Sequence, residues 1–311
     1  MEKVLTISVA AYNMENYIKD TLNSIVSSDV RDLIEVIVVD DESTDNTVKI
    51  VEEYVEKYPN VIKLIKQKNQ GPGSTFNASL KVATGKYIKM VDADDFVDPE
   101  SMNYVINQLK DMDCDMFLTD MDYFDDGEKS VYFTTDLGYE TDKVMDIENY
   151  SVIPEMNSIS FRTKILQDNK IKLSNGFYSD MEYVILPLLH IKNFIYFRKN
   201  LYVYRTGRAG QSTSVEGYRK HIKQHDFIFR EVLSFYANEC LVLNDVVRAA
   251  IRNRLIYMAD SEVDTLLSYD EVDVDKVKEF KDFVKKTDIE FYDIMNDYLL
   301  SNHGIDIEEY K

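Results

Sequence analysis

The first hundred residues alternate between apolar, β-rich segments and helical patterns, and this alternation restricts the fold more than any other feature. Residues 4–12 and 34–40 are nearly continuous apolar runs, which is typical of strands that are buried on both faces. Residues 61–67 and 86–95 predict two further strands, and helical patterns separate the four segments. Strand–helix–strand order predicts right-handed βαβ units, so we expect an α/β fold with a mainly parallel, Rossmann-like sheet flanked by helices.

The middle of the chain mixes strand-like pieces with acidic turns and is less regular. Within it, residues 177–191 predict a helix and residues 193–205 predict a strand or a hairpin. From about residue 215 onward the pattern is helical. We therefore expect two domains, a sheet domain over 1–215 and a C-terminal helical region over 216–311.

Charge and cysteine content restrict the class of protein. The formal net charge is −20, from 36 basic and 56 acidic side chains, which disfavours binding to nucleic acid and broad contact with anionic lipid. Cys114 and Cys240 form no CxxC pair, which favours a reducing compartment. The N-terminus lacks a signal-peptide pattern, and no apolar run approaches the roughly 20 residues that span a bilayer. We expect a soluble, cytoplasmic chain without a transmembrane segment, and leave peripheral association with the inner face of the membrane open.

Polar clusters follow three of the predicted strands. "AAYNMEN" comes after the first strand, "DDESTD" after the second and "DADD" after the fourth. In open α/β sheets, ligands bind outside the carboxyl ends of the strands. The sequence therefore predicts one site, at the sheet edge where these three clusters meet.

The last cluster suits a metal ion. Asp92 and Asp94 are two residues apart on an extended segment, so their carboxylates point to the same side. Mg²⁺ and Mn²⁺ are typically held by one or two carboxylates together with the phosphates of a substrate. The alternative is an acidic turn that caps the next helix near Asp98. Taken alone, the aspartates favour this turn over a metal site. The acidic pair in "DDESTD" and the Gly-rich segment 69–77 instead favour a nucleotide diphosphate bridged by a metal ion.

The ordered set of motifs resembles the inverting family-2 glycosyltransferases with the GT-A fold. The resemblance covers roughly residues 3–215, and the Gly-Pro-Gly turn is particularly similar to members that decorate wall teichoic acids and other bacterial surface polymers. The matching segments are "ISVAAYNMENYI", "VIVVDDESTDNT", "NQGPGSTFNASLKVATGKYIKMVDADD", "SDMEYVILPLL" and "YVYRTGRAGQS".

The resemblance implies an activity. The chain would transfer a hexosyl or N-acetylhexosaminyl group from a nucleotide-sugar, a UDP-sugar in the first place, with the help of Mn²⁺ or Mg²⁺. The acceptor would be a hydroxyl group of a glycan, a polyol-phosphate or a lipid-linked polymer in the synthesis of a bacterial cell wall or capsule.

It also implies roles for single residues. Asp94 would ligate the metal, and Asp41 would bind the uracil edge, with Asp40 as the second candidate. Asp92 would meet the ribose or the donor sugar, and Asp95 would bind the sugar or orient the loop. The other residues implied at the donor site are Ala11, Tyr12, Glu15, Gly71, Gly73, Ser74, Asn77, Arg205, Arg208, Gln211 and Ser212.

The transfer needs a base for the acceptor hydroxyl, and the family places it in a Glu-Asp pair at a helix start. Here the pair reads Ser179-Asp180, so we expect Asp180 to be the base, with Glu182 as the second choice. Judged without the family, Asp180 is explained as an acid in a first helical turn. A second departure lies at Thr75-Phe76, where many relatives carry Ala-Arg, which removes a possible phosphate contact.

Three other functions stay open from the sequence. A nucleotidyltransferase would have a Gly-rich, basic loop after the first strand, which "AAYNMEN" lacks. A receiver domain would carry its acidic pair after the first strand and be about half as long. A non-catalytic sugar-nucleotide-binding protein would keep its function without Asp180. The C-terminal helices could form a homo-oligomer, and His221 and His225 are four residues apart there, which we interpret as a packed or solvated pair.

Overall fold

The computed structural model describes residues 2–207, 215–269 and 272–310. These residues form two compact units. The first contains residues 2–147 and 154–207, and the second contains residues 148–153 together with the described residues from 215 onward. The boundary predicted near residue 215 adjoins residues outside the described part.

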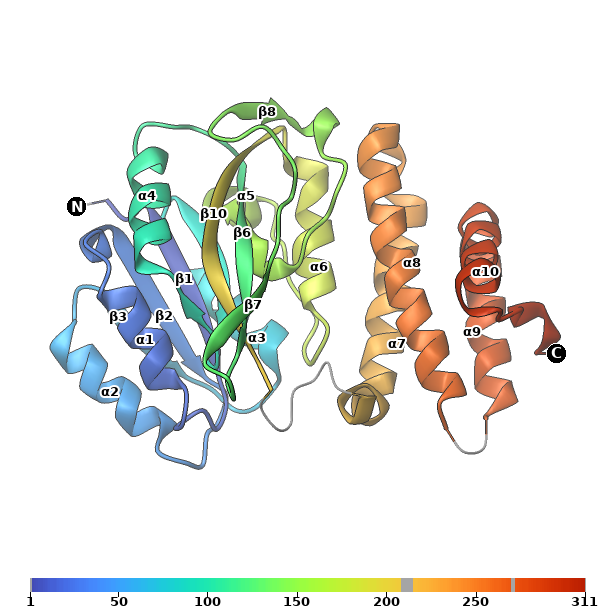
Figure 1. The fold of residues 1–311 in the computed structure, drawn as a ribbon, viewed down its shortest axis with the longest axis horizontal. Helices are drawn as coiled ribbons and strands as arrows, with labels where there is room; N and C mark the ends of the chain where they lie inside the picture. The colour runs from blue at the N-terminus through green and yellow to red at the C-terminus, as the bar shows by residue number, and fades with distance from the viewer. Residues whose placement is uncertain (1, 208–214, 270–271, 311) are drawn as a thin grey trace. The chain divides into compact units, whose positions relative to one another are not determined.

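The first unit is built on one ten-stranded sheet (Figure 1). Eight of its strands follow the order β3-β2-β1-β4-β9-β6-β10-β5, and β7 pairs with β6 and β8 with β10 beside this path. The strands β1 to β4 pair in parallel, as do β6 and β10, whereas β9 is antiparallel to both β4 and β6. The strand bounds are β1 Leu5–Ala11, β2 Ile34–Asp40, β3 Ile62–Lys66, β4 Tyr87–Asp92, β5 Phe96–Val97, β6 Met116–Asp125, β7 Ser130–Thr134, β8 Val144–Asp146, β9 Ile159–Arg162 and β10 Asn193–Thr206.

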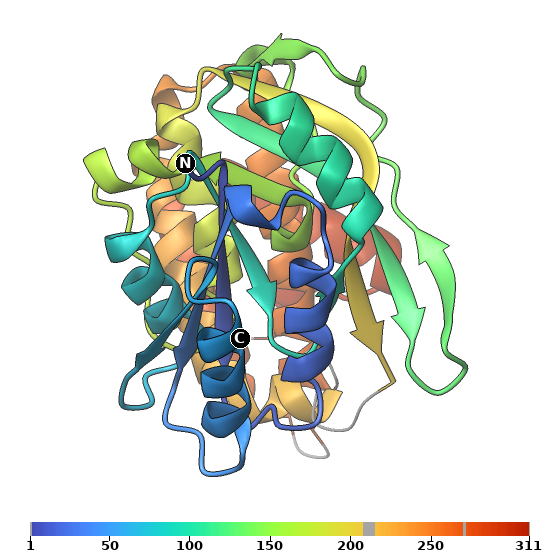
Figure 2. The same ribbon diagram turned by 90° about the vertical axis from the view of Figure 1, so that its left-hand side faces the viewer.

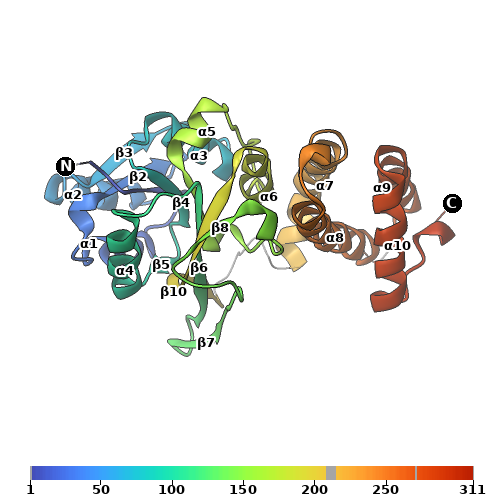
Figure 3. The same ribbon diagram turned by 90° about the horizontal axis from the view of Figure 1, so that it is seen from above.

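Helices cover both faces of this sheet (Figure 3). One face carries α1, α2 and α4, and the other carries α3, α5 and α6. Every residue of β2 is buried, which explains why its sequence is apolar without alternation. The helix bounds are α1 Ile18–Val26, α2 Thr47–Lys57, α3 Pro72–Val82, α4 Pro99–Leu109, α5 Thr163–Asp168 and α6 Asp180–Ile185.

The less regular middle of the chain gives two differences from the predicted elements. The helix expected over 177–191 is α-helical only over α6 and continues as a 3₁₀ turn over Leu186–His190. Pro187 lies in that turn, and a proline has no N–H group to continue an α-helix. Residues 193–205 form the single long strand β10, whose pairing with β6 shifts register between Phe197 and Tyr202. The strand β7, in green, pairs with the last part of β6 and lies at the outside of the sheet (Figure 2).

The second unit is helical. Its helices are α7 Val215–Asn238, α8 Asp245–Leu267, α9 Val274–Thr287 and α10 Ile289–His303, within the region that the sequence predicted to be helical as a whole. The ring of Phe229 packs against Phe280 and Phe291 in its core. His225 is buried, with Nδ1 2.5 Å from Glu262 Oε2, so this histidine is packed. Within the described residues, no helix combines the length and the apolar character that crossing a membrane requires.

Candidate active site

The ends of β1, β2 and β4 lie at one edge of the sheet. Ala11 pairs with Asp40 across β1 and β2, and Ala10 pairs with Asp92 across β1 and β4. The three polar clusters that follow these strands therefore start side by side. This confirms the convergence predicted from the βαβ order.

The loops after β1 and β2 are tied together by side chains. Asn13 Oδ1 accepts a hydrogen bond from the Thr44 N–H at 2.8 Å. Glu15 Oε2 accepts from the backbone N–H of Asn46 at 3.0 Å and from its Nδ2 at 2.6 Å. The structure thus uses Glu15 to join two loops, while Tyr12, also predicted at the site, keeps 47% of its surface exposed at this edge.

The acidic pair that ends β2 splits into two different environments. Asp41 is buried, and its carboxylate accepts from Gln67 Nε2 at 2.8 Å and from the backbone N–H groups of Gln70 and Gly71 at 3.1 and 2.8 Å. Asp40 is equally buried and accepts through Oδ2 from the Ser43 N–H at 3.3 Å. Its Oδ1 has no hydrogen-bond partner in the described part of the chain. A buried acceptor without a partner suits an N–H group of a ligand.

The Gly-rich turn lies backbone to backbone against residues 174–176. Gly71 has φ +87°, and a Cβ atom there would lie 2.5 Å from Gly176 Cα. A Cβ atom on Gly73 would lie 1.9 Å from the Ser174 carbonyl oxygen. Ser74 Oγ donates to the Gly71 carbonyl oxygen at 2.7 Å and so closes the first turn of α3. Both glycines are therefore required by a close approach of two loops.

The loop that contacts the Gly-rich turn is the one before α6, which carries the two candidate bases. Asn77 and Leu173 exchange two hydrogen bonds, with Nδ2 donating at 2.8 Å and Oδ1 accepting at 2.9 Å, which fixes the loop before α6. Glu182 is buried, and its carboxylate accepts from the Ser174 N–H at 2.6 Å and from Ser174 Oγ at 2.7 Å. Asp180 is the first residue of α6 and is partly exposed. Glu182 is thus engaged in holding the loop through Ser174.

The acidic loop after β4 is largely buried. Asp94 is 6% exposed and Asp95 is 1% exposed. Asp95 Oδ2 accepts from the Tyr202 hydroxyl at 2.5 Å, and Oδ1 accepts from the Arg205 N–H at 2.8 Å. Burial raises the pKa of Asp95 well above its usual value, and the charges of Asp94 and Asp92 raise it further. Of the two roles expected for Asp95, these contacts favour orienting the loop.

Arg205 brings a buried positive charge to this loop. Its Nε donates to the Asp94 carbonyl oxygen at 2.8 Å, and its terminal nitrogens donate to Asp126 Oδ1 at 2.5 Å and to Asp20 Oδ2 at 3.0 Å. The guanidinium group therefore links three chain segments beside the acidic loop. Arg208, Gln211 and Ser212, which were predicted to act with it, lie outside the described residues.

The carboxylates of this loop suit a divalent metal ion. The alternative, an acidic turn that caps a helix, is met by Asp98, whose Oδ2 accepts from the Ser101 N–H at 2.7 Å at the start of α4. Capping therefore does not explain Asp92 and Asp94. Asp92, Asp94 and Asp95 bring three carboxyl groups to one short loop, and a hard cation with oxygen ligands would compensate their negative charge.

Lys89 is a residue that the sequence reading missed. It lies in β4 with its side chain fully buried, and its Nζ donates to the Asn157 carbonyl oxygen. Nζ also lies 5.6 Å from the ring centre of Tyr202, the residue that holds Asp95. Burial lowers the pKa of Lys89 to about 7. A lysine inside the apolar segment "YIKMV" was the available signal.

Comparisons with known proteins agree with this architecture. Glycosyl transferase family 2 matches residues 6–175, more than half of the chain. The chain is 28% identical over 255 residues to the poly(ribitol-phosphate) beta-N-acetylglucosaminyltransferase TarS of Staphylococcus aureus, which is 81% of this chain and 42% of TarS. The chain thus spans about two fifths of the length of that relative.

Two solved structures share the fold. The structure of S. aureus TarS 1–349 in complex with UDP-GlcNAc has a TM-score of 0.66 at 22% identity, over 99% of this chain and 89% of that one. The mannosyltransferase PcManGT of Pyrobaculum calidifontis, in complex with GDP-Man and Mn²⁺, has a TM-score of 0.55 at 15% identity, over 96% and 87%. The expected GT-A-type fold is thereby confirmed. From the match over residues 6–175, this chain belongs to glycosyl transferase family 2.

Proposed function

We propose that this chain is a metal-dependent, inverting glycosyltransferase that moves a sugar from a UDP-sugar to a hydroxyl group of a surface polymer. The observation that carries the proposal is the pairing of Ala11 with Asp40 and of Ala10 with Asp92, which gathers three polar strand ends at one edge. Family membership supplies the reaction class. The UDP-GlcNAc in the TarS structure supports a UDP-linked donor.

The uracil base would be bound at the end of β2. A uracil ring offers an N–H group that needs a buried acceptor. Asp40 Oδ1 is such an acceptor, whereas the Asp41 carboxylate already accepts from Gln67, Gln70 and Gly71. We therefore assign the uracil contact to Asp40 and the anchoring of the Gly-rich turn to Asp41. The exposed ring of Tyr12 lies after β1, at the same edge.

Asp94 would hold the metal ion, with Asp92 at the donor sugar or the ribose. Mn²⁺ or Mg²⁺ suits these oxygen ligands, and the bound ion would neutralise charge that develops on the leaving diphosphate. The chain's own part is to keep the loop rigid. Asp95 does this by accepting from Tyr202 and from the Arg205 N–H, and the Arg205 side chain holds the Asp94 carbonyl oxygen.

Asp180 would be the general base. Its carboxylate takes the proton of the acceptor hydroxyl while that oxygen forms a bond to the sugar C1 atom and the bond from C1 to the diphosphate breaks. Attack from the face opposite the diphosphate inverts the configuration at C1. Glu182 is the weaker candidate because Ser174 donates two hydrogen bonds to its carboxylate.

The acceptor would be a hydroxyl group on a polyol-phosphate, glycan or lipid-linked polymer. We favour a polyol-phosphate because TarS is named as a poly(ribitol-phosphate) transferase. Both cysteines are buried and free, as expected if the reaction takes place in the reducing cytoplasm, at the inner face of the membrane.

The proposal predicts a specific loss in Asp180→Asn. With UDP-GlcNAc, Mn²⁺ and poly(ribitol phosphate), we expect kcat to fall by about 10²–10⁴-fold, the range for loss of a general base. The Kd for UDP should stay unchanged, since Asp180 serves the acceptor. Asp168→Asn, which removes an exposed acid in α5, is the matched control and should keep full turnover.

Two results would count against the assignment. If Asp180→Asn retained wild-type turnover, Asp180 would not be the base. If the wild-type chain bound UDP but showed no turnover with any sugar nucleotide, the alternative of a non-catalytic binding protein would replace the enzyme.

A further inference from the structure

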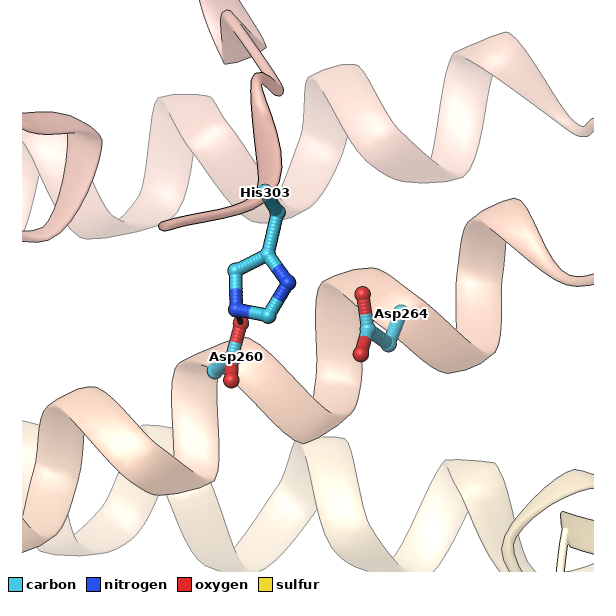
Figure 4. Close-up of side chains that lie close together, drawn as sticks. All are labelled: Asp260, Asp264 and His303. Atoms are coloured by element: carbon cyan, nitrogen blue, oxygen red, sulfur yellow. Dashed lines mark ion pairs between the residues drawn. The ribbon is translucent and has the colours of Figure 1, made fainter. Parts of the chain in front are cut away.

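Three potential metal ligands meet in the second unit, on helices to which no function has been assigned. Asp260 and Asp264 are one turn apart on α8, and His303 is the last residue of α10 (Figure 4). One ligand atom from each residue lies within 4.8 Å of the other two. His303 Nε2 is 3.1 Å from Asp260 Oδ1. The sheet-edge site is built by residues of the first unit, and none of these three residues belongs to that unit.

The cluster has two carboxylates and only one imidazole, so its negative charge exceeds the positive charge that His303 can supply. Asp260 Oδ1 is buried and accepts no well-aligned hydrogen bond from the described residues, although His303 Nε2 lies 3.1 Å from it. Asp264 is exposed and makes no hydrogen bond or ion pair of its side chain with another described residue. An ion pair between His303 and Asp260 accounts for one carboxylate but leaves the second beside it. A divalent cation would satisfy both.

The donor set indicates which cation. One imidazole nitrogen and two carboxylate oxygens are ligands of Zn²⁺ and similar transition metals, whereas Mg²⁺ and Ca²⁺ prefer oxygen alone. Zinc bonds of about 2.0–2.2 Å place two ligand atoms roughly 3.3–3.6 Å apart in a tetrahedron. The distance from His303 Nε2 to Asp260 Oδ1, 3.1 Å, is a few tenths of an ångström shorter, so a small separation of the two atoms would admit the ion. Asp264 is an exposed side chain, so a change of rotamer can bring its carboxylate closer.

The backbone around the cluster is suited to a fixed site. Asp260 and Asp264 share one face of α8, because residues four apart on a helix lie above one another. His303 is held at the end of α10, where Gly304 follows with φ +69° and closes the helix. The rings of Tyr257 on α8 and Tyr298 on α10 also pack together, with centres 6.1 Å apart. The two helices therefore already meet where the ligands lie.

We propose that Asp260, Asp264 and His303 bind one divalent transition-metal ion of the zinc class. The bound ion joins the last turn of α10 to the C-terminal half of α8. With three protein ligands, the fourth position is left to water. Its role is structural, stabilising the helical unit.

The test is a zinc titration of the metal-stripped full chain in an Asp94→Asn background, which removes the proposed donor-site ligand. Bound zinc is counted per chain after equilibrium dialysis. The midpoint of thermal unfolding is followed with and without Zn²⁺. The variants are His303→Gln and Asp264→Asn. Asp297→Asn is the control, because it removes an equal charge from an exposed position of α10 outside the cluster.

We expect one zinc ion per chain in the background protein and in Asp297→Asn, with a higher unfolding midpoint when zinc is present. His303→Gln and Asp264→Asn should each lose that ion and the shift in midpoint. Since Asp264 is exposed, its variant keeps the fold and remains informative even if His303→Gln does not fold. Equal zinc content in all four proteins, or none in the background protein, would overturn the proposal and leave a His303–Asp260 ion pair.

Discussion

Asp41, Asp95 and Glu182 accept hydrogen bonds from the protein itself, and each lies within two positions of an acid to which we assign chemistry. Asp41 holds the Gly-rich turn, Asp95 holds the acidic loop and Glu182 holds the loop before α6. A buried carboxylate needs such donors, because an unpaired charge is expensive to bury. At the scale of single residues, the site thus combines acids that hold its loops in place with neighbouring acids to which we assign ligand binding or catalysis.

Buried Lys89 should make the stability of the chain depend on pH. Its pKa is about 7 in the folded chain and 10.5 when exposed, so between these values the unfolded chain holds one more proton than the folded one. Stability of the wild type should therefore rise with pH through this window, relative to Lys89→Met, by up to about 1.4 kcal/mol per pH unit. Below pH 7 the difference should be constant and least favourable to the wild type.

Denaturant unfolding of both proteins at several pH values measures this difference. Because only the difference between the two proteins is used, other titrating groups cancel. A difference that does not change between pH 7 and pH 10 would show that Lys89 stays charged in the folded chain.

At the scale of elements, the close approach of the Gly-rich turn to residues 174–176 brings the start of α3 to the loop before α6. Gly71→Ala should disrupt it, since a Cβ atom would lie 2.5 Å from Gly176 Cα. Gly138→Ala is a suitable control, because its φ is also positive, at +75°, but its Cβ atom would meet nothing within 4 Å. Positive φ strains both variants, and at Gly71 a ψ of 170° places the backbone in a region that is essentially restricted to glycine. The clash with Gly176 adds to this strain only at Gly71.

We therefore expect Gly71→Ala to be less stable than Gly138→Ala by at least about 1 kcal/mol and to bind UDP more weakly, because Asp41 holds the same turn. Chemical denaturation and calorimetric UDP titration give the two values. Equal loss of stability in both variants would mean that the loops can separate without cost.

Elements with strong local signals were predictable from the sequence. The strand expected over 34–40 is β2, Ile34–Asp40, because a strand covered on both faces is continuously apolar. The longer helix expected at 177–191 was wrong beyond Ile185, where packing and Pro187 favour a 3₁₀ turn. Whether 193–205 formed one strand or a hairpin depended on pairing with β6, which is 70 or more residues distant in sequence and leaves no local mark.

At the scale of the whole molecule, topology made the location of the candidate site predictable, because parallel strands place their carboxyl ends at one edge. The partners of each side chain were not predictable. The sequence did not indicate that the Gly-rich turn donates to Asp41 while Asp40 Oδ1 stays without a donor in the described residues, and our proposal of Asp40 at the uracil edge rests on this difference. The cluster of Asp260, Asp264 and His303 joins helices that are far apart in sequence, and the sequence predicted only one helical region there without the bounds of α10.

The central claim is that the acids after β4 bind a pyrophosphate through a shared metal ion. The most direct measurement is the Kd of UDP for the wild type and for Asp94→Asn, in Mn²⁺ and in EDTA. We predict that Mn²⁺ lowers the Kd of the wild type at least about tenfold, or 1.4 kcal/mol, and leaves that of Asp94→Asn nearly unchanged. Equal Kd values for the wild type with and without metal would contradict the account.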